Sequence, residues 1–152
     1  MRLNTIPALI TKFLLYLLLA VTVTAIVAMP FCLEKWIAQW DEFNGAAGYT
    51  AFLFAFLALT GACAAWIIIE LIGVMRTLSS EPFILRNARA LRRMGIAGEA
   101  AALLFLIKCF VFITPMTVVC CGALILAGLF ALVLSGVFAQ AVRYKQENDL
   151  TI

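Results

Sequence analysis

The chain has 152 residues, of which 66% are hydrophobic and 12% charged, and it carries a formal net charge of +3 without any histidine. Because a soluble domain is about 45–50% apolar and about 25% charged, this composition argues against a soluble fold and indicates a membrane protein. The lack of histidine argues against the common zinc and haem sites and against a histidine base. No phosphate-binding glycine loop stands out either, so we expect no enzyme, no cofactor and no metal.

Four apolar stretches are long enough to cross a bilayer, which takes about 20 residues per helix. They cover residues 10–31, 49–74, 96–114 and 116–142, and a polar tail follows at 143–152. The first stretch is longer than the apolar core of a signal peptide, and no cleavage pattern follows it, so we expect it to remain in the protein. The sequence therefore predicts one all-α domain over residues 1–152, a bundle of four transmembrane helices.

Two kinds of residue mark the outer ends of these stretches. Pro30 and Pro115 fall where we expect the first and third helices to end. Cys32, Cys120 and Cys121 lie near the same predicted face, so a disulfide from Cys32 to one of the other two stays open. Cysteine in an apolar helix is more often simply a small hydrophobic residue.

The distribution of positive charge predicts the orientation of the helices. Lysine and arginine gather before the first stretch, between the second and third, and after the fourth. The first connection carries more acidic than basic residues, and the last carries no charge. Because positively charged loops stay in the cytoplasm, we expect both termini on the cytoplasmic side of a bacterial plasma membrane.

The segment SSEPFILRNARALRRMG, residues 79–95, holds four arginines, and Arg76 precedes it. On a helical wheel one side of the segment is basic and another is apolar. The basic side consists of Arg86, Arg89, Arg92 and Arg93. This pattern predicts a short amphipathic helix in the membrane interface, in contact with anionic headgroups and bending into the third membrane helix at Gly95. A docking surface for a cytoplasmic partner is the alternative.

Small residues indicate how the helices pack, because close backbone approach matters where lipid removes the hydrophobic drive. The second stretch pairs Gly61 with Ala65 and Ala58 with Ala62. The fourth carries an i, i+4 stripe of Ala127, Ala131, Ser135 and Ala139. We expect these faces to point inward, either within the bundle or toward a second copy in a homo-oligomer.

Three ionisable residues, Glu70, Glu99 and Lys108, lie inside the predicted spans. A charge at mid-bilayer costs at least about 2.5–3.5 kcal/mol, so such residues are functional candidates. We expect the two glutamates, near the cytoplasmic face, to pair with Arg76, with Arg93 or with each other. Lys108 is predicted to lie deeper, with an acceptor among Thr22, Thr24 and Thr60. A small transporter or channel component using these three charges is one possible function.

Two segments resemble a known family. The arginine-rich segment resembles the loop G-E-P-F-x-x-x-N-x-x-R-L-R-R-I-G, and the end YKQENDLTI resembles L-x-E-x-D-L-T-V, both from the YoaS-like group of small bacterial four-helix membrane proteins of unknown function. Ser80 replaces a common glycine, and Ala90 replaces a common basic residue. The residues that match are Glu81, Pro82, Phe83, Asn87, Arg89, Leu91, Arg92, Arg93 and Gly95, with Glu147, Asp149, Leu150 and Thr151 in the tail.

This resemblance implies a partner, because members are often encoded beside a small helix-turn-helix transcription regulator. The partner would contact DNA, and this chain would not. The tail itself favours a binding role, since DLTI returns to apolar residues in a polar end. It either folds back to pair Glu147 or Asp149 with the arginines or serves as a short motif for the partner. The leading hypothesis is an interaction scaffold that holds a cytoplasmic regulator.

Overall fold

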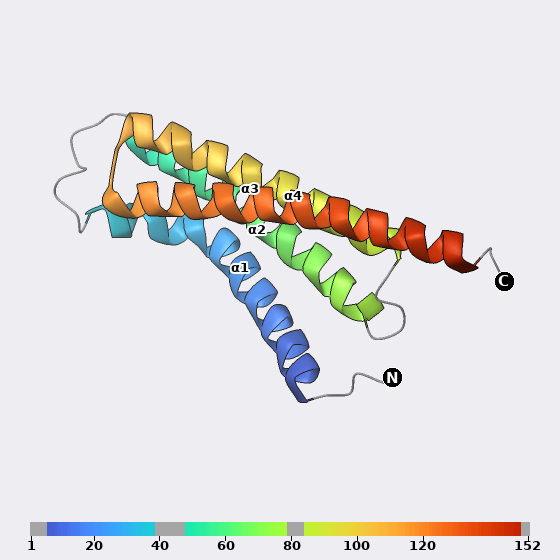
Figure 1. Cartoon of the computed structure of the whole chain (residues 1–152). Coiled ribbons are helices and arrows are strands. Elements are labelled where there is room, and N and C mark those ends of the chain that lie inside the picture. The colour runs from blue at the N-terminus through green and yellow to red at the C-terminus, as the bar shows by residue number, and fades with distance from the viewer. Residues whose placement is uncertain (1–5, 39–47, 79–83, 150–152) are drawn as a thin grey trace.

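The fold consists of four long helices (Figure 1). The structure is a computed structural model that describes residues 6–38, 48–78 and 84–149. The helices are α1 (Ile6–Ala38), α2 (Tyr49–Leu78), α3 (Leu85–Val111) and α4 (Pro115–Asp149), and the described residues contain no strand. All four are long and apolar enough to cross a membrane. The predicted all-α class and four spans are therefore confirmed, and the chain is a multi-pass membrane protein.

The two prolines behave differently. Pro115 is the first residue of α4, a position that suits proline because the N–H it lacks would have no partner there. Pro30 lies inside α1, so the expectation that it ends the helix is wrong. In lipid, ending the helix at Pro30 would leave more backbone groups unpaired than the single hydrogen bond that proline removes.

The helices form a row in which each packs on the next along the chain. The contact between α3 and α4 is the most extensive, while α1 packs mainly on α2. The start of α1, the end of α2, the start of α3 and the end of α4 lie at one end of the molecule, and α1 diverges from α4 toward that end (Figure 1). We call it the arginine end, because it carries Arg76, Arg86, Arg89, Arg92 and Arg93.

Small residues spaced seven apart join α3 to α4. The buried positions are Ala88, Gly95 and Ala102 on α3 and Cys121, Gly128 and Ser135 on α4. The Ser135 Oγ donates to the Ala88 carbonyl at 2.8 Å, and the Cys121 Sγ donates to the Ala102 carbonyl at 3.6 Å. Such a repeat keeps two antiparallel helices in contact over many turns.

This spacing corrects the stripe expected on α4. Of its four members only Ser135 is buried, and Ala127 is exposed. An i, i+4 series turns by about 40° around a helix at each step, so it cannot face one neighbour over three steps. On α2 the expectation for Gly61 is confirmed, since a Cβ there would lie 2.9 Å from the Ile26 side chain of α1.

The arginine-rich segment is not a separate helix. Its residues from Leu85 onward are the first turns of α3, which runs unbroken to Val111, so the bend expected at Gly95 is absent. Gly95 serves packing instead. A Cβ on it would lie 2.7 Å from the Leu132 Cγ and 3.0 Å from the Gly128 carbonyl oxygen. The glycine thus permits a close approach of α3 to α4.

The five cysteines are all free thiols. The disulfide left open between Cys32 and Cys120 or Cys121 is therefore not formed. Cys121 is buried in the α3–α4 contact, whereas Cys32 is exposed on α1.

We expect Gly95→Ala to destabilise the protein by about 1–3 kcal/mol, because the added methyl group overpacks the α3–α4 contact. Gly136→Ala is the matched control, since beyond the nearby backbone of α4 itself no described atom lies within 4 Å of a Cβ at that position. The control should leave stability unchanged or raise it by up to about 1 kcal/mol through better helix propensity. Thermal unfolding in detergent measures both variants, and equal melting temperatures would contradict this packing.

Candidate functional site

The arginines on the first turns of α3 form the candidate site. All four side chains, Arg86, Arg89, Arg92 and Arg93, are exposed. Three of them recur at intervals of three and four residues, which places them on one face of the helix. Arg86, Arg89 and Arg93 line a polar cleft of about 330 Å³ together with Glu70 of α2. Arg92 does not line it, so the cluster divides between the cleft and another face.

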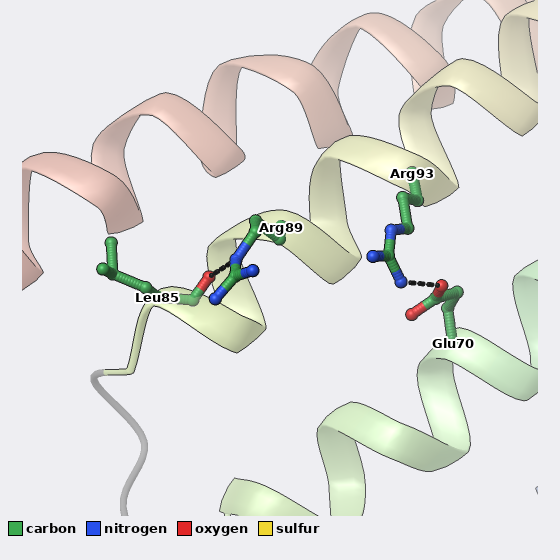
Figure 2. Close-up of polar contacts among 4 residues, drawn as sticks. All are labelled: Glu70, Leu85, Arg89 and Arg93. Carbon is green, nitrogen blue, oxygen red and sulfur yellow. Dashed lines mark hydrogen bonds and ion pairs between the residues drawn. The ribbon is translucent and has the colours of Figure 1, made fainter.

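The cleft is crossed by an ion pair between α2 and α3. Figure 2 shows Arg93 reaching toward Glu70, with 3.0 Å between the Nη1 and Oε1 atoms. The Glu70 side chain is 15% exposed and the Arg93 side chain 58%, so solvent limits the contribution to about 1 kcal/mol or less. The expected ion pair at Glu70 is confirmed, with Arg93 as its partner.

The rest of the cleft keeps its positive charge. The Arg89 Nε donates to the Leu85 carbonyl of its own helix at 3.4 Å (Figure 2). Neither Arg86 nor Arg89 forms an ion pair with an acidic side chain of the described residues. Guanidinium groups match the geometry of phosphate and carboxylate oxygens, so the cleft is suited to an anion. No group of three His, Cys, Asp or Glu residues within the described ranges could hold a metal ion.

Three residues expected at this surface have structural contacts instead. Arg76 donates from its Nη2 to the Tyr16 hydroxyl at 2.6 Å and links α2 to α1. Asn87 is only 2% exposed, and its Oδ1 accepts from the Thr77 Oγ1 at 2.5 Å, which links α3 to α2. Gly95 lies in the α3–α4 contact. Whether a side chain is buried depends on how its helix lies against the neighbouring helices, and the sequence pattern does not show that arrangement.

The remaining matches to the family segments lie near or beyond the edge of the described residues. Glu81, Pro82, Phe83, Leu150 and Thr151 fall outside them. Glu147 is exposed on α4, which continues as a helix through Asp149 and extends past the other helices (Figure 1). The tail therefore does not fold back within its described part.

Glu99 does not belong to the cleft, and its expected pairing with Arg76, Arg93 or Glu70 is wrong. Its Oε1 atom is shielded from solvent and has no hydrogen-bond partner among the described residues. A Cβ at Gly128 would lie 2.5 Å from this atom, so the carboxyl group rests against the backbone of α4. The face of α3 that carries Glu99 turns toward α4 rather than α2, a rotation that only the helix contacts reveal.

Lys108 lies in the last turn of α3, nearer a helix end than expected. Its Nζ donates to the Thr117 Oγ1 at 2.9 Å and lies 5.7 Å from the centre of the Phe56 ring. The expected acceptors are wrong, because Lys108 donates to Thr117, while the hydroxyls of Thr22, Thr24 and Thr60 donate to carbonyls of their own helices. A cation is favourable at the C-terminal end of a helix, where carbonyl groups lack partners.

Comparison with known proteins finds one family that matches nearly the whole chain. A family model described as "Protein of unknown function (DUF2975)" matches residues 5–152. No curated protein and no solved structure matches the chain. The family description specifies no activity, ligand or partner.

We expect Asn87→Ala to destabilise the protein by about 1–3 kcal/mol, because it removes the hydrogen bond that the buried Asn87 side chain accepts from α2. Asn148→Ala makes the same chemical change at an exposed position of α4 and should have little effect. Thermal unfolding followed by circular dichroism compares the two variants. Equal stability would show that Asn87 does not fasten the helices together.

Proposed function

The chain belongs to the DUF2975 family of proteins of unknown function, and from that premise we propose that it is a membrane scaffold for a cytoplasmic regulator. It lies in a bacterial plasma membrane with both termini in the cytoplasm, where the arginine end holds a helix-turn-helix transcription regulator and limits its access to DNA. The four apolar helices support the membrane location. The excess of lysine and arginine at the arginine end supports the orientation.

The observation that carries this proposal is the unneutralised charge at the arginine end. Arg89 and Arg92 are exposed and have no ion pair within the described residues. Orientation alone needs about two or three positive charges, so the cluster exceeds that need. An acidic patch on a soluble partner would complement these arginines, speed the encounter and fix its register.

The scaffold needs no chemistry of its own. We propose that the chain is not an enzyme and does not contact DNA directly, since it lacks histidine and the arginines belong to a membrane helix. The shape of α4 favours this role, because its last turns extend past the start of α3 at the arginine end (Figure 1). A partner bound at this end would then contact both the start of α3 and the end of α4.

Transport is not favoured by the geometry. Each of the three charged groups has a different surrounding: Glu70 pairs with Arg93, Glu99 rests against Gly128, and Lys108 bonds to Thr117. A proton or ion path needs polar groups in succession through the membrane. These three contacts supply no such succession.

We expect Arg89→Gln/Arg92→Gln to reduce the regulator that co-purifies with the protein by about tenfold or more, because hydrogen bonds to charged groups contribute about 1.5–3 kcal/mol each. The protein is tagged at its N-terminus, so that the tail stays free, and purified from its own host in mild detergent. Arg2→Gln/Lys12→Gln is the control, since it removes the same charge ahead of or within α1.

Two results would contradict the scaffold. The first is an undiminished yield of partner with the Arg89→Gln/Arg92→Gln variant. The second is the wild-type protein emerging with no soluble regulator bound. A C-terminal reporter that fluoresces only in the cytoplasm verifies that each variant keeps its orientation.

A further inference from the structure

Two hollows between α2 and α3 meet at one residue. The polar cleft of Glu70, Arg86, Arg89 and Arg93 lies at the arginine end. An apolar groove of about 430 Å³ begins at the same Arg93 and is otherwise lined by Ala62, Cys63, Trp66, Ile96, Ala97 and Ala100. We propose that the two form one binding site for an anionic phospholipid, with the phosphate in the cleft and an acyl chain in the groove.

The charges of the cleft select an anionic headgroup. Its carboxylate, Glu70, is neutralised by Arg93 at 3.0 Å, which leaves Arg86 and Arg89 without an acidic partner in the described structure. Arginine binds phosphate oxygens through paired N–H groups, and basic pockets between membrane helices are known to take anionic headgroups. A zwitterionic lipid would bring its own cation into a cleft that already has excess positive charge.

The groove selects a hydrocarbon chain. Small side chains on both helices, Ala62 and Cys63 opposite Ala97 and Ala100, leave the hollow between them. Trp66 and Ile96 are more than half exposed beside it. Apart from Arg93 the lining has no charged side chain, so the groove offers nothing to a soluble anion but contact area to an acyl chain.

The length of the site matches one lipid leaflet. From Arg86 to Ala100 the helix rises about 21 Å, at about 1.5 Å per residue. Half of a bilayer that is about 40–45 Å thick with its headgroups is about 20–22 Å. A phospholipid lying along α3 therefore reaches from the cleft to the far end of the groove without leaving its own leaflet.

The test is competition between two lipids that differ only in headgroup. The full-length protein in mild detergent is mixed with equal amounts of phosphatidylglycerol and phosphatidylcholine of identical acyl chains, and bound lipid is counted by native mass spectrometry. The wild type should retain phosphatidylglycerol in preference. Arg86→Gln/Arg89→Gln should reduce that retention by about tenfold or more, whereas Arg92→Gln, outside the cleft, should not.

A second variant tests the acyl chain separately. Ala100→Phe fills the groove and leaves every arginine in place, so it should also reduce phosphatidylglycerol retention by about tenfold. Ala55→Phe makes the same change at an exposed position of α2 outside the groove and should retain the lipid. If Ala100→Phe does not elute as a single folded species, Cys63→Leu fills the groove from α2 with the same expected loss.

Equal retention of the two lipids by the wild type would overturn the site. So would full retention by both the Ala100→Phe and Cys63→Leu variants, since the contact would then be with the headgroup alone. The site shares Arg89 with the surface proposed for the regulator, and two other variants separate them. Ala100→Phe should lose lipid and keep the regulator, while Arg92→Gln should weaken the regulator and keep the lipid.

Discussion

The close approach of α3 to α4 is the constraint on which the rest of the structure depends. In lipid, apolar side chains gain little by leaving the bilayer for a neighbouring helix, so association depends on packing and on hydrogen bonds. Gly95 and Gly128 remove the side chains that would separate the two backbones, and Ser135 bonds to the Ala88 carbonyl. This contact also sets the rotation of α3, which leaves Arg86 and Arg93 on the side that meets α2.

The arginines that cluster in the sequence therefore have different contacts in the structure. Arg76 fastens α2 to α1 through Tyr16, and Arg93 joins α3 to α2 through Glu70. The remaining arginines have exposed guanidinium groups and no acidic partner in the described ranges, which makes them available to anions from outside the chain. A lipid headgroup and an acidic protein surface can share this end of the molecule, because Arg92 does not line the cleft that Arg86 and Arg89 line.

The charged groups within the apolar helices avoid isolation in different ways. Lys108 finds the Thr117 hydroxyl near the end of its helix, where the backbone dipole also favours a cation. Glu99 instead presses one carboxyl oxygen against Gly128 without a described donor, and a buried polar atom without a hydrogen bond costs free energy. Glycine at that position of α4 gives the carboxyl group the space it occupies.

The four helices and their membrane-spanning character were determined by the sequence alone, because hydrophobic length acts locally. The sequence also predicted that Glu70 forms an ion pair, and it named Arg93 among three candidate partners. The unbroken start of α3 was not predicted, since the amphipathic pattern of the arginine-rich segment indicated a separate helix that bends at Gly95. The burial of Asn87, the partner of Lys108 and the face of Glu99 depend on how each helix is rotated against its neighbours. Only the tertiary structure decided those, because that rotation results from contacts between residues far apart in the chain.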